Sequence, residues 1–271
     1  KIEIDGLSAS AFGTLIIPKG STLTLHGSGS TNASVVDGII RFETGSGTTV
    51  PELYVAGNHL IKKTTSSSIL NIIGADSLHA ANEYGLIRGA QNAKLTLNTR
   101  GAASEPRIGM LGNFRIDVAM ENNGDVNAHP EDAANYTAKI QLVNEAKLGT
   151  GLWKATNGEL IVDAPVSDHG RWVAGTAGTI TINAAVSNDI GIPVSGFFEA
   201  VYTGKIIVKA AVSGSAPWTL KPDGDNADPL VHFDYPCTAL SGNVFIHAGT
   251  LRFDDPFCTS GEFDGDGGRI V

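Results

Sequence analysis

One short pattern recurs along the middle of the chain, and it limits the possible folds more than any other feature. Three segments align without gaps: NGELIVDAPVS at 157–167, AGTITINAAVS at 177–187 and TGKIIVKAAVS at 203–213. In each segment a glycine precedes a short run of alternating apolar residues, and Ala or Pro, Val and Ser follow it. The glycines Gly158, Gly178 and Gly204 thus mark one regular interval and one slightly longer interval.

Weaker copies of this pattern lie on both sides, at 19–27, 67–75, 92–102, 112–122, 138–146 and 241–251. Apolar residues at every second position predict half-buried strands. A strand of about five residues cannot bury its apolar face alone, but stacked copies share a continuous core. The sequence therefore predicts a right-handed parallel β-helix with coils of about 20 residues. A β-sandwich is the alternative, yet a sandwich does not need the same side chains at the same phase of each interval.

The longer intervals predict insertions into a single solenoid domain spanning residues 1–271. We expect surface insertions near 74–90, 122–137 and 187–203. Residues 74–90 are a candidate short helix, and Pro130 followed by two acidic residues resembles a helix start. The third segment is expected to form a longer loop or an extra strand. Roughly a dozen coils, about 4.8 Å apart, would make a rod on the order of 55 Å long.

Charge and hydropathy exclude several classes of function. The formal net charge is −9, and the 19 Lys and Arg residues are scattered, so neither nucleic acid nor an anionic membrane surface has a basic stripe to bind. No apolar run reaches the roughly 18 residues that span a bilayer. The chain opens on strand-like residues rather than a signal peptide, so we expect any targeting segment to be absent from this sequence.

The two cysteines, Cys237 and Cys258, lie about one coil apart in the sequence. Residues one coil apart stack at neighbouring heights, within reach of a disulfide. A disulfide would indicate an oxidising compartment. Two free buried thiols are the alternative.

The segment 216–253 resembles the autotransporter-associated β-strand repeat. The matching residues are Trp218, Thr219, Leu220, Ser241, Gly242, Ile246, Ala248, Gly249, Thr250, Leu251 and Phe253. The match is confined to this segment, and the chain departs from a complete autotransporter in having no membrane β-barrel segment. The resemblance implies a secreted or bacterial cell-surface β-helix and no particular activity, because such passengers include adhesins, fibre proteins and enzymes.

Motifs for common enzyme chemistry are absent: the sequence contains no GxGxxG, HExxH or GxSxG. β-Helix lyases and hydrolases need carboxylates on adjacent coils, often beside a basic residue. The best candidate catalytic cluster is Glu159, Asp163, Asp168, His169 and Arg171, in which Glu159 and Asp163 are expected to share an outer face. An ordinary solvated face and turn is the alternative that we favour.

Two further ligand sites are weak candidates. Asp223, Asp225 and Asp228 lie among small residues, as suits calcium in a flexible turn, although an ordinary polar turn is the alternative that we favour. Trp153 and Trp172 lie about one coil apart and are expected to stack as a ladder, either against sugars or in the core; Trp218 is a third candidate. No cofactor other than calcium is expected.

The sequence thus predicts a non-catalytic extracellular structural or adhesive protein. Both ends of the chain are strand-like, which is expected if copies associate end to end into a fibre or if the chain is a fragment of a longer passenger. The other expected partner is a glycan or protein of a host or cell surface. A carbohydrate-active or carbohydrate-binding β-helix, of the lyase or tailspike kind, is the alternative function.

Overall fold

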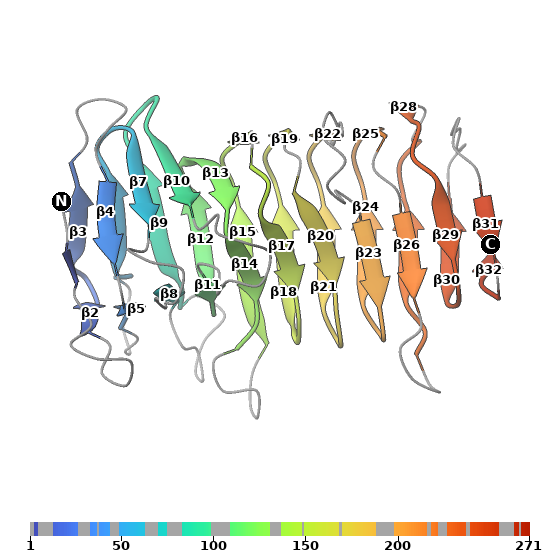
Figure 1. Cartoon of the computed structure of the whole chain (residues 1–271), viewed down its shortest axis with the longest axis horizontal. Coiled ribbons are helices and arrows are strands. Elements are labelled where there is room, and N and C mark those ends of the chain that lie inside the picture. The colour runs from blue at the N-terminus through green and yellow to red at the C-terminus, as the bar shows by residue number, and fades with distance from the viewer. Residues whose placement is uncertain are drawn as a thin grey trace.

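The computed structural model is a stack of coils in which every strand pairs in parallel with strands of neighbouring coils (Figure 1). It describes residues 3–4, 13–26, 33–36, 38–43, 49–62, 70–74, 83–98, 109–130, 137–147, 149–167, 170–187, 198–215, 218–221, 227–236, 239–254, 263–265 and 267–271. Each of the first ten coils contributes one strand to each of three sheets, here called I, II and III, and the described part of the last coil contributes one strand each to sheets II and III. The chain is a parallel β-helix, as the repeat predicts, and its described residues contain no helix.

Sheet I has ten described strands: β1 Glu3–Ile4, β4 Ala33–Val36, β7 His59–Lys62, β10 Lys94–Asn98, β13 Ala119–Asn123, β16 Ala146–Lys147, β19 Val166–Ser167, β22 Val186–Ser187, β25 Val212–Gly214 and β28 Ala239–Leu240. Sheet II has eleven: β2 Gly13–Ile17, β5 Gly38–Phe42, β8 Leu70–Ile73, β11 Gly109–Leu111, β14 Asp125–Ala128, β17 Leu152–Ala155, β20 Arg171–Ala174, β23 Phe198–Val201, β26 Trp218–Lys221, β29 Val244–Ile246 and β31 Phe263–Gly265. Sheet III also has eleven: β3 Thr22–Leu25, β6 Glu52–Val55, β9 Gly85–Gly89, β12 Phe114–Asp117, β15 Ala138–Leu142, β18 Gly158–Val162, β21 Thr179–Ile182, β24 Lys205–Val208, β27 Leu230–Phe233, β30 Thr250–Phe253 and β32 Arg269–Ile270.

Coil length changes along the rod. In the middle of sheet III the register places Glu159 between Lys139 and Thr179, so each of these coils has the predicted length of about 20 residues. Near the N-terminus Thr22 lies beside Glu52, and Glu52 beside Leu86, so those coils are at least one and a half times as long. Eleven strands spaced by about 4.8 Å give a ladder about 48 Å long.

The core is formed by every second residue of the strands. In sheet III, Leu160, Ile180 and Ile206 lie in register on successive coils, and each is fully buried. The outward positions between them are polar or partly exposed. Period-two alternation therefore predicted the inner and outer faces of these strands correctly.

The three strong copies of the pattern lie at one phase, and three of the six weaker copies share it. Gly158, Gly178 and Gly204 lie at or just before the start of β18, β21 and β24 of sheet III, and the following Val-Ser pairs form short strands of sheet I. Segments 19–27, 112–122 and 138–146 contain β3, β12 and β15 of sheet III, as the alignment predicts, whereas 67–75 contains β8 of sheet II, 92–102 contains β10 of sheet I and 241–251 contains β29 of sheet II. Aligning the last three as equivalent copies was wrong, because the strands of all three sheets share one alternating pattern.

The recurring glycines mark places where one coil crosses closely over the coil before it. A Cβ atom built on Gly178 would lie 2.0 Å from the carbonyl oxygen of Ala155, and one on Gly204 would lie 2.0 Å from that of Ala174. Real Cβ atoms cannot approach backbone oxygen so closely, so only glycine fits. The glycine is therefore required by the stacking of coils rather than by turn geometry alone.

Each of the three expected insertions contains a regular strand. Residues 74–90 include β9, 122–137 include β14, and 187–203 include β23. The expected helix at 74–90 is therefore wrong for Gly85–Gly89, which alternate as a strand does. The strand at 198–201 is the ordinary sheet II strand of its coil rather than an addition. Residues 75–82, 131–136 and 188–197 lie outside the described part of the chain.

Within that described part, no helix is long and apolar enough to cross a membrane.

Candidate functional site

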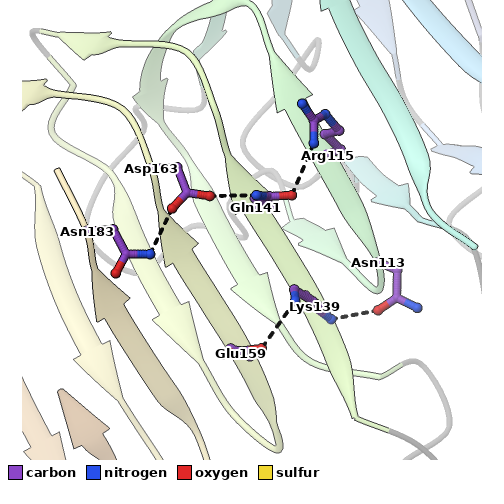
Figure 2. A network of polar contacts seen from close by, with 7 residues as sticks. All are labelled: Asn113, Arg115, Lys139, Gln141, Glu159, Asp163 and Asn183. Atoms are coloured by element: carbon purple, nitrogen blue, oxygen red, sulfur yellow. Dashed lines mark hydrogen bonds and ion pairs between the residues drawn. The ribbon is translucent and has the colours of Figure 1, made fainter. Parts of the chain in front are cut away.

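The candidate catalytic residues Glu159 and Asp163 lie on the outer face of sheet III (Figure 2). Glu159 is the second residue of β18, and Asp163 directly follows that strand. Because side chains alternate along a strand, residues four apart point to the same side, which confirms the shared outer face. Each carboxylate is held by side chains from the neighbouring coils.

Asp163 is the acceptor at the centre of a chain of hydrogen bonds across four coils. Gln141 Nε2 donates to Asp163 Oδ2 at 2.5 Å, and Asn183 Nδ2 donates to Asp163 Oδ1 at 2.8 Å. Arg115 Nη1 donates to Gln141 Oε1 at 3.4 Å, which extends the chain by one coil (Figure 2). Both carboxylate oxygens of Asp163 are therefore engaged in stacking one coil on the next.

Glu159 forms a looser contact on the same face. Its Oε2 lies 3.6 Å from Lys139 Nζ, and both side chains are more than a third exposed. The backbone N–H of Lys139 in turn donates to Asn113 Oδ1 at 2.6 Å (Figure 2). Like Asp163, Glu159 connects its own coil to the coil before it.

Glu159 and Asp163 lie four residues apart, so their Cα atoms are separated by about 13 Å along the strand. Each carboxylate is directed to polar partners on neighbouring coils, Glu159 to Lys139 and Asp163 to Gln141 and Asn183. In this arrangement both side chains hold coils together.

Arg171 does not join this pair, because it lies on another sheet. It begins β20 of sheet II, where its Nη2 is 3.0 Å from Glu199 Oε2 on β23 of the next coil. Along β23, Glu199 lies between the buried core residues Phe198 and Ala200 and faces outward. Its side chain is nevertheless only 9% exposed. The structure thus separates Arg171 from Glu159 and Asp163, while Asp168 and His169 lie outside the described residues.

A cluster that the sequence analysis missed lies on the outer face of sheet III, in the coils of β27 and β30. His232 Nε2 is 2.7 Å from Asp254 Oδ2, and Arg252 Nε donates to Asp254 Oδ1 at 2.8 Å. The register places His232 directly beside Arg252. The hydrogen bond from His232, then that from Arg252, lowers the pKa of Asp254 below its usual value.

This cluster could have been found from the repeat. The strands VHF at 231–233 and LRF at 251–253 align one coil apart, and each is followed by Asp. The glycines of this region do not follow the interval of the strong copies as closely, which hid the alignment. Aligning the inward-facing Val231 and Leu251 would have placed the outward-facing His232 and Arg252 side by side.

The candidate sugar-stacking residues Trp153 and Trp172 lie in the core. Their rings stack with centroids 5.3 Å apart and an interplanar angle of 14°, and Phe198 continues the stack at 6.0 Å. All three side chains are fully buried. The ladder expected from their spacing is confirmed, and it is a core ladder rather than an exposed platform.

Most of the candidate calcium site and the cysteine pair fall outside the described residues. Asp223, Asp225, Cys237 and Cys258 are among those not described, while Asp228 is described and exposed. Among the residues that the structure does describe, no group of three or more His, Cys, Asp or Glu side chains is arranged to hold a metal ion.

Comparison with known proteins adds no relative: no family model, curated protein or solved structure matches the chain.

Proposed function

We propose that this protein is a non-catalytic, extracellular structural or adhesive β-helix. The observation that carries the proposal is how the outer-face carboxylates are used. Asp163, Glu159 and Glu199 each contact a polar partner on an adjacent coil. Charged side chains that bind neighbouring coils to one another give the rod a rigid lateral surface, and a stalk, fibre or adhesin requires such a surface.

The extracellular setting is part of the proposal and rests on sequence features. The segment 216–253 resembles autotransporter-associated repeats, and the acidic balance suits a secreted protein. The Cys237–Cys258 disulfide stays a prediction. Its support is that the ladders beside it advance by a similar interval, from Leu230 to Thr250 and from Val244 to Phe263. Peptide mapping without reductant tests it.

End-to-end assembly is the structural form of this function. The outermost strands of a β-helix carry backbone N–H and C=O groups that another coil can pair with, whether that coil belongs to the same chain or another copy. Light scattering over a concentration series, with electron microscopy, tests it. Growth into rods is the expected result, and a monodisperse monomer at high concentration would contradict it.

The lyase or tailspike alternative predicts turnover of a glycan. The test is to pass the purified chain over immobilised polysaccharides and measure retained protein and released sugar together. Retention on at least one polysaccharide, or assembly into rods, without sugar release is the expected outcome. Release that is lost in Glu159→Gln or Asp163→Asn would overturn the non-catalytic proposal.

A further inference from the structure

Two carboxylates lie on consecutive coils at one edge of sheet III. Asp234 directly follows β27, and Asp254 directly follows β30. Phe233 lies beside Phe253, and the backbone N–H of Asp254 donates to the carbonyl of Phe233, so the ladder continues to this position. The two aspartates are therefore neighbours in the ladder, with backbones about 4.8 Å apart.

The two carboxylates differ in what holds them. Asp254 is fixed between His232 and Arg252, at 2.7 and 2.8 Å. The Asp234 side chain is exposed, and no hydrogen bond or ion pair joins it to another described residue. His232 directs Nε2 to Asp254, and its side chain is 17% exposed. The Arg252 side chain is 52% exposed, so part of its guanidinium also remains in reach of a ligand.

An exposed aromatic residue follows directly. Tyr235 is 40% exposed and is one of few large hydrophobic side chains so exposed among the described residues. A tyrosine ring offers an apolar face and a polar hydroxyl, and therefore suits a ligand that is apolar on one side and hydroxylated around its edge. Pyranose sugars have this character, since their C–H groups gather on one face.

We propose that His232, Asp234, Tyr235, Arg252 and Asp254 form a binding site for an uncharged glycan. Tyr235 stacks on a sugar ring, and the fixed polar groups exchange hydrogen bonds with its hydroxyls. The site selects neutral sugars because Asp234 repels an anionic one, while the charge of Arg252 is already balanced by Asp254. It rests on the adhesive form of the proposed function and gives that function a partner.

The test uses the whole chain and a panel of neutral hexasaccharides built on glucose, galactose, mannose, xylose or N-acetylglucosamine. Hexagalacturonate serves as the anionic comparison, and every titration is repeated with a calcium chelator. Saturation-transfer NMR detects binding, and calorimetry measures Kd for the oligosaccharide with the strongest signal. Asp234→Asn and Tyr235→Ala remove the two groups without disturbing the Asp254 contacts. Glu159→Gln and Ile16→Ala are matched controls elsewhere on the surface.

We expect at least one neutral hexasaccharide to bind, with chelator present, and each site substitution to raise its Kd about tenfold or more. The controls should change Kd less than about twofold. No transfer to any neutral sugar, binding of hexagalacturonate alone, or binding that needs calcium would overturn the site. Glycan binding that survives both site substitutions would overturn the site and leave an adhesive function standing, whereas cleavage of the sugar would contradict the proposed function itself.

Discussion

At the corner between sheets II and III, single residues decide whether one coil can lie on the next. One residue before the glycine in the first two strong copies, and two residues before it in the third, the backbone is left-handed: Asn157 (φ 51°), Ala177 (φ 50°) and Tyr202 (φ 56°). Asparagine tolerates this conformation, whereas alanine and tyrosine are strained in it. The glycine that follows lies against the carbonyl of the coil before it. The corner thus combines a strained residue with one that has no room for a side chain.

Substitution of Gly178 by alanine should destabilise the protein by about 3 kcal/mol, because the new Cβ would lie 2.0 Å from the Ala155 carbonyl oxygen. Gly175, in the same turn, is the matched control. The nearest atom to its Cβ would be in the Thr156 side chain, at 3.2 Å. We expect Gly175→Ala to cost less than about 1 kcal/mol. Denaturant midpoints measure both variants, and equal losses would contradict the close-crossing explanation.

Ala177→Gly should have the opposite sign. Glycine adopts the left-handed conformation without the strain of about 1 to 2 kcal/mol that an alanine side chain incurs. The greater conformational freedom of glycine in the unfolded state offsets part of this stabilisation, so we expect a net stabilisation of about 0.5 to 1 kcal/mol. Asn157→Gly should change stability much less. A drop in the melting temperature of Ala177→Gly would show that the corner is not strained there.

At the scale of the strands, the polar contacts between neighbouring coils differ in burial, and therefore in how much they contribute to the free energy of unfolding. Glu199, on β23, has a side chain only 9% exposed, whereas that of Glu159, on β18, is 38% exposed. Exposed ion pairs contribute about 0 to 1 kcal/mol because water and salt screen them. Removing one partner of a buried pair costs several times more, since a charge is left without its counter-ion.

Glu199→Ala should therefore destabilise the protein by about 2 kcal/mol, toward the low end for buried pairs because Arg171 is 40% exposed. Glu159→Ala should cost less than about 1 kcal/mol. Double-mutant cycles with Arg171→Ala and Lys139→Ala separate the pair energies from other effects. A larger coupling energy for Glu159 and Lys139 would contradict this order.

The contact between β27 and β30 should weaken in acid. Hydrogen bonds from His232 and Arg252 lower the pKa of Asp254. A carboxylate whose folded pKa is depressed stabilises the folded state above its unfolded pKa, about 3.9, and loses that contribution as pH falls through the lower folded value. Melting temperatures between pH 6 and pH 2 should fall less steeply for Asp254→Asn than for the unaltered chain. Parallel curves would show that Asp254 does not contribute.

Over the whole molecule, the sequence predicted the coil and the face of each central strand because both follow from side chains alone. Alternating residues such as Ile180 and Ile182 face the core, and the phase of the glycines predicted the length of the central coils. The alignment placed only half of the weaker copies on the correct sheet: 112–122 and 138–146, for example, contain strands of sheet III, but 67–75 does not. Alternation alone cannot separate these cases, since sheets I, II and III all alternate in the same way.

The candidate site was harder to predict, because it depends on which sheet and which coil each side chain occupies. Glu159 and Arg171 are close in sequence, yet one lies on sheet III and the other on sheet II. His232 and Asp254 belong to different coils and meet at 2.7 Å. Proximity in a solenoid follows the register of coils, and the sequence shows that register only where the repeat is regular.

Because each coil contacts mainly its neighbours, a whole coil should be removable from the regular region. Deleting residues 159–178 joins Gly158 to Thr179, which preserves a glycine before β21 and brings Thr179 beside Lys139 in the ladder. We expect this variant to fold with parallel-sheet circular dichroism, a rod shorter by about 4.8 Å in X-ray scattering, and a lower melting temperature. Deleting only residues 159–168 is the control, because half a coil shifts every later strand to the wrong sheet. If the half-coil deletion folds as well as the full one, the stability of the molecule does not depend on the register of its coils.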